Sequence, residues 1–148
     1  MIHINRSSNL VEGLQALSML SSLTQWYPDF EHWFINKALP GIVMGQDQLL
    51  VARDKELLVG VALIKKSRKE TKLRCVRVVP SHQSTGLGIR LIDAALEALG
   101  TSKPHCTVAE EMLHTYSRLF VQRYGFALNA VEKGLYRPGK LEYVFNQP

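Results

Sequence analysis

The segment from Val78 to Leu91 constrains the fold of this chain more than any other part of it. An apolar stretch ends at Pro80, a polar loop contains Gly86 and Gly88, and an amphipathic helix pattern follows directly. Glycine adopts backbone angles that other residues avoid, and without a side chain it lets main-chain N–H groups approach a ligand closely. The following helix directs its unpaired N–H groups and its positive dipole end to the same place. The segment therefore predicts an anion-binding junction between a strand and a helix.

Two nucleotide-binding signatures rest on the same physics, and neither fits this chain. The dinucleotide fingerprint requires a third glycine three residues after the second, where Leu91 stands. The segment Gly134–Leu141 imitates a phosphate-binding loop, but it contains Pro138 and ends in Leu instead of Ser or Thr. The junction therefore belongs to another class of anion-binding site.

The pattern Val-x-Pro-x-x-Gln-x-x-Gly-Leu-Gly-x-x-Leu in residues 78–91 resembles the acetyl-CoA-binding motif of the GCN5-related N-acetyltransferase (GNAT) superfamily. In that family Gln or Arg opens a Q/R-x-x-G-x-G/A loop, and the order of elements resembles the family over about residues 48–145. The resemblance implies that acetyl-CoA is a co-substrate and that main-chain N–H groups of the loop hold its pyrophosphate. The implied cofactor-binding residues of the loop are Gln83, Ser84, Thr85, Gly86, Leu87, Gly88 and Ile89.

The composition fits one globular domain over residues 1–148, because 46% hydrophobic and 21% charged residues are enough for one core. The resemblance implies that this single domain is an N-acetyltransferase. The chain contains no run of 18 apolar residues and no basic-then-apolar N-terminal order, so we expect a cytoplasmic protein that does not span a membrane. Cys75 and Cys106 lack Cys-x-x-Cys spacing, and His105 and Cys106 point to opposite faces of a strand. We therefore expect buried thiols and no metal site.

The formal net charge of +5 favours anionic ligands, among which are the phosphates of acetyl-CoA. The densest basic run, residues 65–69, lies between two strand patterns and is typical of a solvated turn. No aromatic residues interleave with it, as they do on single-stranded nucleic-acid surfaces. A nucleic-acid partner therefore stays open but unsupported, and a homodimer stays open as well.

Hydrophobic periodicity predicts an alternation of strands and helices. A helix should begin at an Asn9 and Glu12 capping box and run to about Leu23, and a second should begin near Pro28 and end at Leu39–Gly41. The helix Gly88–Leu99 should stop at Gly100, and another is expected over Leu113–Tyr124. Strands are expected at Ile2–Asn5, Gln48–Arg53, Leu57–Lys65, Lys72–Val79, His105–Ala109, Phe126–Tyr136 and Leu141–Phe145.

These elements predict an α+β fold with a mixed, mostly antiparallel sheet of six to seven strands and about four flanking helices. The resemblance adds that the strands Lys72–Val79 and His105–Ala109 splay apart. The pantetheine arm of acetyl-CoA would then lie between them and pair with the main chain of Val76, Arg77 and Val78.

Acetyl transfer to an amine requires a deprotonated amine and a protonated thiolate leaving group. Many family members supply the thiolate proton from a Tyr in a Phe-Tyr-x-x-x-Gly-Phe segment, but Val121 stands at that position here. We take Tyr124 as the candidate acid, with a packing role as its alternative, whereas Tyr116 should point elsewhere. His114 and Ser117 share the helical face of Val121 and are the implied contacts to the cofactor arm.

Acidic residues near the ends of the two splayed strands are the candidates for the general base. We prefer Glu110, which follows the strand His105–Ala109, because the family often carries an acidic residue at this strand end. Glu111 and Glu70 are alternatives, and all three fit solvated loop carboxylates equally well.

The expected function is transfer of an acetyl group from acetyl-CoA to a primary amine by direct transfer. The alternative is an acetyl-CoA-binding regulatory or partner protein without turnover, which Val121 motivates. The acceptor is a small-molecule or protein amine whose identity the sequence leaves open. Five aromatic residues between Trp26 and Phe34 fit either a core or a wall of the acceptor cleft.

Overall fold

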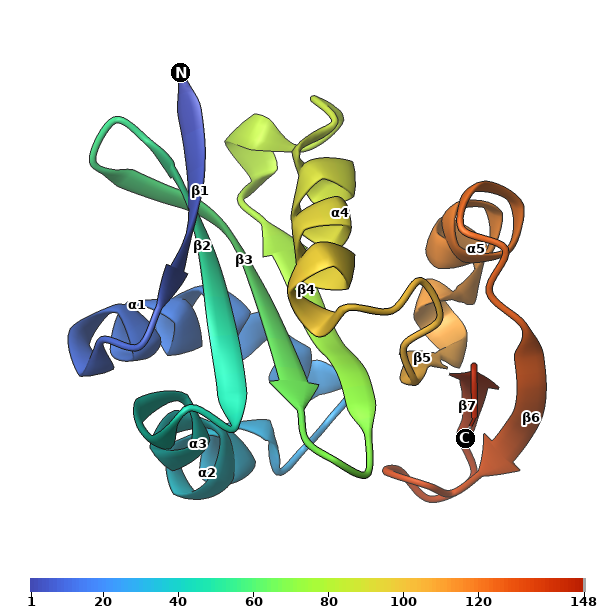
Figure 1. Ribbon diagram of the computed structural model, residues 1–148. Coiled ribbons are helices and arrows are strands. Elements are labelled where there is room, and N and C mark those ends of the chain that lie inside the picture. The colour runs from blue at the N-terminus through green and yellow to red at the C-terminus, as the bar shows by residue number, and fades with distance from the viewer. Residues whose placement is uncertain (148) are drawn as a thin grey trace.

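A computed structural model describes residues 1–147 as an α+β fold with two antiparallel sheets (Figure 1). The first sheet has the order β1-β2-β3-β4 and the second the order β5-β7-β6. The expected α+β architecture with six to seven strands is confirmed, and its seven strands are divided between two sheets instead of forming one. The strands are β1 (Ile2–Ser7), β2 (Asp47–Asp54), β3 (Leu57–Lys66), β4 (Thr71–Val78), β5 (Cys106–Ala109), β6 (Leu128–Lys133) and β7 (Leu141–Phe145).

Helices cover both faces of the first sheet, with α1 to α3 on one face and α4 on the other (Figure 1). Short 3-10 segments occupy Ser21–Gln25, Pro80–His82 and Glu110–Met112, and wide π-helical turns occupy Phe34–Ala38 and Arg118–Arg123. Among residues 1–147, no helix has the length and apolar character needed to cross a bilayer. The α-helices are α1 (Leu10–Leu20), α2 (Phe30–Trp33), α3 (Leu39–Met44), α4 (Leu87–Leu99) and α5 (Leu113–Ser117).

The central strand β3 is buried on both faces and separates two hydrophobic clusters. Val61 and Leu63 pack with the helices α1 to α3, whereas Ala62 and Ile64 pack with α4. This alternation follows from the two-residue period of a strand. Figure 1 shows α4 lying across β3 and β4, so the apolar side of α4 fixes the helix that follows the glycine loop.

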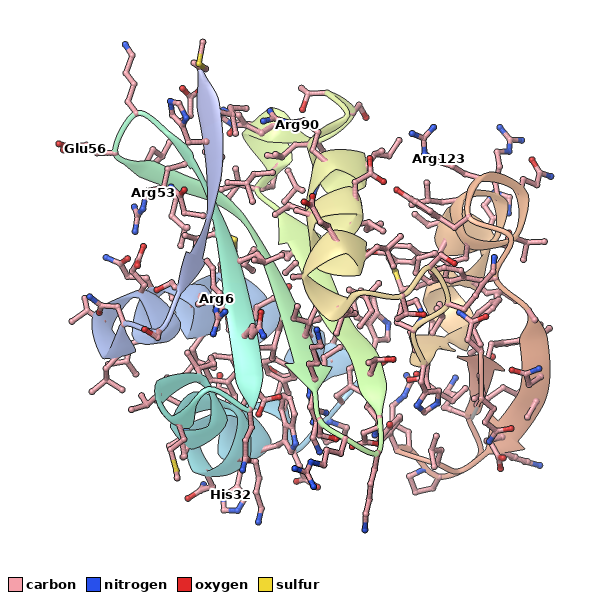
Figure 2. The ribbon with its side chains drawn as sticks, viewed as in Figure 1. Arg6, His32, Arg53, Glu56, Arg90 and Arg123 are labelled. Atoms are coloured by element: carbon pink, nitrogen blue, oxygen red, sulfur yellow. The ribbon has the colours of Figure 1, made fainter. Side chains whose placement is uncertain are left out.

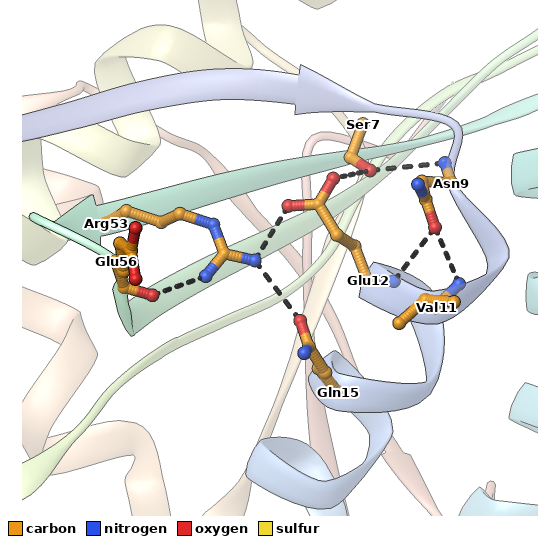
Figure 3. A network of polar contacts seen from close by, with 7 residues as sticks. All are labelled: Ser7, Asn9, Val11, Glu12, Gln15, Arg53 and Glu56. Carbon is orange, nitrogen blue, oxygen red and sulfur yellow. Dashed lines mark hydrogen bonds and ion pairs between the residues drawn. The ribbon is translucent and has the colours of Figure 1, made fainter.

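A polar network, and not the predicted capping box between Asn9 and Glu12, holds the start of α1 (Figure 3). The side chain of Asn9 accepts hydrogen bonds from the N–H groups of Val11 at 2.7 Å and Glu12 at 3.3 Å, as expected for an N-cap. The carboxylate of Glu12 does not return to the Asn9 N–H. It accepts from the Ser7 hydroxyl at 2.6 Å and pairs with Arg53 at 2.9 Å, which ties α1 to β1 and β2.

The second helical region continues past the predicted stop at Leu39–Gly41. In the π-helical turn before α3, the N–H of Leu39 donates to the carbonyl of Phe34, five residues earlier. This wide turn accepts Pro40 at the start of α3, where a missing N–H costs little. The helix then ends at Gly45, which has the positive φ of 92° that favours glycine.

The predicted strand Phe126–Tyr136 is shorter than expected. Strand β6 spans Leu128–Lys133, and the chain then bends through Gly134 and turns at Gly139, with φ angles of 78° and 74°. The bends place Tyr136 outside the sheet and beside Tyr27, at a ring-centroid distance of 5.2 Å. The end of the predicted strand thus contributes an aromatic side chain to the cleft described below.

Candidate active site

The loop between β4 and α4 changes direction through two residues with positive φ. A 3-10 turn spans Pro80–His82, and Ser84 and Gly86 then adopt φ angles of 63° and 84° before α4 begins at Leu87. Gly86 is the N-cap residue, and its left-handed conformation suits glycine. The helix therefore starts immediately after the turn, with its N-terminus facing the loop.

This loop presents a run of free donors. Within residues 1–147, the main-chain N–H groups from Ser84 to Ile89 have no hydrogen-bond acceptor, and the first helical bond runs from Arg90 N to Gly86 O at 3.1 Å. A Cβ built on Gly86 or Gly88 would meet no atom within 4 Å, so open space lies above both glycines. Free N–H groups, open space and a helix N-terminus together fit a pyrophosphate.

Side chains of the loop fix its shape. Gln83 Nε2 donates to the carbonyl of Val78 at 2.9 Å, and His82 Nε2 lies 3.0 Å from an oxygen of Asp54. The hydrogen bond with His82 lowers the pKa of Asp54. On the other side, Arg90 in the first turn of α4 donates to the carbonyl of Ile2 at 3.1 Å (Figure 2). The loop is thus held on both sides while its N–H groups stay free.

The strands β4 and β5 meet at one point and then separate. A single parallel bridge joins Lys72 and His105, with hydrogen bonds from Leu73 N to His105 O at 3.0 Å and from His105 N to Thr71 O at 2.9 Å. Beyond this bridge, each strand pairs only with its own sheet among the described residues. The facing edges of β4 and β5 therefore leave main-chain groups free. This separation of the two strands beyond the bridge is the expected splay.

A cleft of about 380 Å³ occupies the gap between the two strands. Residues 72–77 of β4 form one wall and residues 105–109 form the other. The segment before α2, α2 itself, α5 and the β6–β7 connection supply further side chains. The aromatic residues that line the cleft are Trp26, Tyr27, Phe30, Trp33, Tyr116, Phe120 and Tyr136.

An irregularity in β4 directs Arg74 into this cleft. The register between β3 and β4 shifts where Leu63 pairs with Cys75 and Ile64 pairs with Leu73, which leaves Arg74 as the extra residue of a bulge. Its guanidinium lies 5.0 Å from the ring centroid of Trp33 and pairs with the buried carboxylate of Asp47 at 3.1 Å. Its charge is therefore neutralised inside the protein.

A second buried carboxylate, Glu142 of β7, is bound by a neutral hydroxyl. Tyr27 donates to Glu142 Oε1 at 2.7 Å, and Glu142 is only 3% exposed. Burial raises the pKa of Glu142, and burial together with this hydrogen bond raises the pKa of Tyr27. No sequence pattern indicates this pair, because the two residues are 115 positions apart.

Tyr116 also lines the cleft, contrary to the expectation that it points elsewhere. Its ring stacks on Phe120 at 5.3 Å, and burial raises the pKa of its hydroxyl. Val121 is instead 47% exposed, so the helical face that borders the cleft is the one that carries Tyr116 and Phe120. A raised pKa keeps this phenol protonated and able to donate.

Only some of the residues predicted to contact the cofactor arm lie in the cleft. Val76 and Arg77 line the cleft, and Val78 is buried beside it with 9% exposure. His114 is exposed and Ser117 is half-buried, and neither side chain lines the cleft. Their roles stay predictions.

The two predicted catalytic residues, Tyr124 and Glu110, lie outside the cleft. The hydroxyl of Tyr124 donates to Asp93 of α4 at 2.7 Å, and burial together with this bond raises its pKa to about 12. Glu110 accepts a hydrogen bond from the N–H of Leu141 at 2.8 Å. Neither lines the cleft, and Val121 is 47% exposed on the surface. The catalytic roles of Tyr124 and Glu110 therefore stay predictions.

The two cysteines and the histidines do not assemble into a metal site in the part of the chain that the structure describes. Burial raises the pKa of both Cys75 and Cys106 to about 12, so both are protonated thiols at neutral pH. Cys75 lines the cleft from β4.

A mixed fold with a splayed sheet and a glycine loop at a helix N-terminus defines a class of acyl-CoA-dependent transferases. The family model of the acetyltransferase (GNAT) domain matches residues 23–134, so the chain belongs to the GNAT family. No curated protein sequence matches the chain.

Solved structures share the fold at low sequence identity. A protein from Desulfovibrio desulfuricans described as a GNAT acetyltransferase is 18% identical, with a TM-score of 0.77 over 98% of this chain and 97% of that one. The PaiA N-acetyltransferase from Thermoplasma acidophilum, solved with coenzyme A, is 15% identical, with a TM-score of 0.72 over 99% of both chains. The ribosomal-protein-S18-alanine N-acetyltransferase from Escherichia coli is 14% identical, with a TM-score of 0.72 over 98% of this chain and 92% of that one.

Proposed function

We propose that this protein binds acetyl-CoA and transfers the acetyl group directly to a primary amine, with residues 1–148 acting as one N-acetyltransferase domain. The observation that carries the proposal is the run of free N–H groups from Ser84 to Ile89, placed at the N-terminus of α4 and next to the splayed strands. The PaiA N-acetyltransferase has the same fold and was solved with coenzyme A, which supports this ligand.

The chain offers a distinct group for each part of the co-substrate. The loop residues 84–89 would hold the pyrophosphate, and the free edge of β4 at Val76, Arg77 and Val78 would pair with the amides of the pantetheine arm. The thioester would then lie in the cleft between β4 and β5. Extended main-chain pairing fixes its carbonyl for attack, which accounts for direct transfer without an acyl-enzyme.

Among the hydroxyl groups of the chain, Tyr116 is the best placed proton donor for the departing thiolate. It lies in the cleft and its pKa is raised by burial, whereas Tyr124 is engaged with Asp93 outside the cleft. A thiol has an ordinary pKa near 8.5, so the thiolate is a good leaving group. A dedicated proton donor therefore raises the rate, but turnover continues without one. We therefore expect turnover despite Val121.

Calorimetry with acetyl-CoA, followed by thiol release with a panel of primary amines, tests the proposal. The expected result is tight binding and release of coenzyme A with at least one amine. Binding without turnover on any amine would favour a regulatory acetyl-CoA-binding protein, and absence of binding would reject both functions. A steep loss of acceptor affinity with added salt would indicate an RNA acceptor.

A further inference from the structure

Glu142 differs from the other buried carboxylate of the cleft region in how its charge is balanced. Asp47 pairs with the guanidinium of Arg74 at 3.1 Å. Glu142 has no Lys or Arg side chain within ion-pair distance among residues 1–147, and the nearby Arg137 is bound to Glu111 by two contacts of 2.6 and 2.7 Å. A buried carboxylate without a cation is costly, so a ligand cation would be stabilised beside it.

Tyr27 lies between Glu142 and the cleft. Its hydroxyl donates to the carboxylate at 2.7 Å, and the same residue lines the cleft wall. Its ring meets Tyr136 edge to face, with centroids 5.2 Å apart and an interplanar angle of 81°. The hydroxyl oxygen keeps lone pairs that can accept a hydrogen bond from a group in the cleft.

The surroundings of this pair suit a cation with an apolar body. Trp26 and Phe30 line the same cleft, and aromatic faces attract cations, whereas the ring of Trp33 already carries the guanidinium of Arg74. A carboxylate reached through Tyr27 in such a wall favours an ammonium group over carboxylate or phosphate groups. An alkyl or aromatic chain attached to the ammonium would replace water against the aromatic rings.

We propose that Tyr27 and Glu142 bind the acceptor as a primary alkylammonium ion and take its proton, with Tyr27 touching the amine and Glu142 acting through Tyr27. This inference rests on the proposed acetyltransferase function and names the acceptor class and the proton acceptor for it. It assigns to the Tyr27–Glu142 pair the role of general base that was predicted from the sequence for Glu110.

Proton transfer from the ammonium comes first. The ammonium gives one proton to the oxygen of Tyr27 while the Tyr27 hydroxyl proton moves to Glu142 Oε1, which leaves a neutral amine and a protonated carboxyl group. The amine nitrogen forms a bond to the thioester carbon as the carbon–sulfur bond breaks. The new amide nitrogen loses a second proton, the thiolate gains one, and Glu142 returns its proton to solvent.

The electrostatics of the pair are consistent with this role. Burial raises the pKa of Glu142, which brings it closer to the pKa of a base that works near neutral pH. Burial and the carboxylate raise the pKa of Tyr27, so Tyr27 stays protonated and passes a proton on instead of storing a charge. The polar groups that act on Glu142 are Tyr27, Thr107, Arg137 and Glu111.

The test uses benzylamine, which is protonated near pH 7, and aniline, which is neutral there. Glu142→Gln keeps the shape and the hydrogen bond from Tyr27 but removes the base, and Tyr27→Phe removes the relay. We expect each variant to lower kcat/KM for benzylamine by about 10²–10⁴-fold near pH 7. Aniline should be acetylated within about threefold of wild type, because it needs no proton removal before attack.

The pH profile and a binding measurement complete the test. Raising the pH to about 10, where benzylamine becomes neutral in solution, should restore most of the activity of Glu142→Gln. By calorimetry near pH 7, benzylammonium should bind wild type at least about tenfold more tightly than Glu142→Gln. The control Glu132→Gln removes the same charge from the cross-strand position and should leave rates and binding unchanged.

The outcomes separate this inference from the proposed function. Wild type that binds acetyl-CoA but not benzylammonium, or a Glu142→Gln variant with an unaltered pH profile, overturns the ammonium site and leaves the transferase standing. Equal losses for benzylamine and aniline at all pH values indicate a structural defect and also overturn it. Failure of wild type to bind acetyl-CoA rejects the proposed function instead.

Discussion

The two ends of the proposed site are built in different ways. The proposed cofactor end consists of main-chain N–H groups from one contiguous segment, residues 84–89, at the start of α4. The proposed acceptor end consists of side chains from distant segments, such as Tyr27 and Glu142, which are 115 positions apart. Every residue has a main chain, so the first end depends on backbone shape, whereas the second depends on individual side-chain atoms. Substitutions should therefore act by blocking space at one end and by removing single atoms at the other.

The largest effect is expected at the cofactor end. Gly88→Asp places a carboxylate in the open space above the helix N-terminus, where the pyrophosphate would lie. Bulk and negative charge should weaken acetyl-CoA binding by about 10³-fold or more, as measured by calorimetry. Gly88 has a helical backbone, so the fold should survive this substitution. Gly86→Asp should abolish binding as well, but it also adds backbone strain, because Gly86 has a φ of 84°.

Ser102→Asp is the matched control, since it adds the same charge beyond the opposite end of α4. It should bind acetyl-CoA like wild type. If folded Gly88→Asp kept its affinity, the loop would not hold the cofactor, and the contrast between the two ends of the proposed site would disappear.

The same contrast explains what could be predicted from the sequence. The loop, α4 and the strands around them were predictable because their signals are local: glycine spacing, a strand period of two and a helix period near 3.6. The Tyr27–Glu142 pair carries no local signal, because it exists only once β7 lies beside the segment before α2. A buried glutamate in the last strand reads as an ordinary polar position until the fold is known.

A further expectation failed because of an irregular helical turn. The helix expected to stop at Leu39–Gly41 continues to Met44. A π-helical turn precedes α3, with wider spacing than an α-helix. Patterns with a fixed period of 3.6 cannot register such a turn.

The second prediction concerns the buried ion pair that anchors the acceptor side of β4. Arg74→Met leaves the carboxylate of Asp47 buried without its cation and removes the contact with Trp33. We expect a loss of about 2–3 kcal/mol in the free energy of unfolding by urea denaturation. Adding Asp47→Asn should recover much of this loss. A double variant as unstable as Arg74→Met alone would contradict the role of the unpaired charge.

The third prediction compares two tyrosines, one in the cleft and one against α4. Tyr116→Phe should lower kcat about tenfold or more without changing the affinity for acetyl-CoA, because it removes the donor to the thiolate. Tyr124→Phe loses the hydrogen bonds to Asp93 at 2.7 Å and to the carbonyl of Ile89 at 3.5 Å, and it should change kcat by less than about threefold. The reverse order of effects would restore Tyr124 as the acid. Val121→Tyr adds a phenol on the exposed side of the π-helical turn and tests whether a donor there raises kcat.

The smallest effect should appear in stability and bears on why Glu142 is a carboxylate. Its pKa is raised by burial, so the unfolded chain releases this proton at a lower pH than the folded protein does. The folded state then binds more protons, and its stability falls as the pH rises above the ordinary carboxyl range. Glu142→Gln lacks this pH-dependent loss of stability. Its free energy of unfolding should therefore match that of wild type near pH 4 and equal or exceed it by up to about 1 kcal/mol near pH 7.

Urea denaturation at both pH values measures the difference between variant and wild type. The control variant Glu132→Gln, at an exposed position, should show no such difference. A variant less stable than wild type near pH 7 would mean that the carboxylate supports the fold, and the acceptor end would lose its strongest sign of a group retained for function.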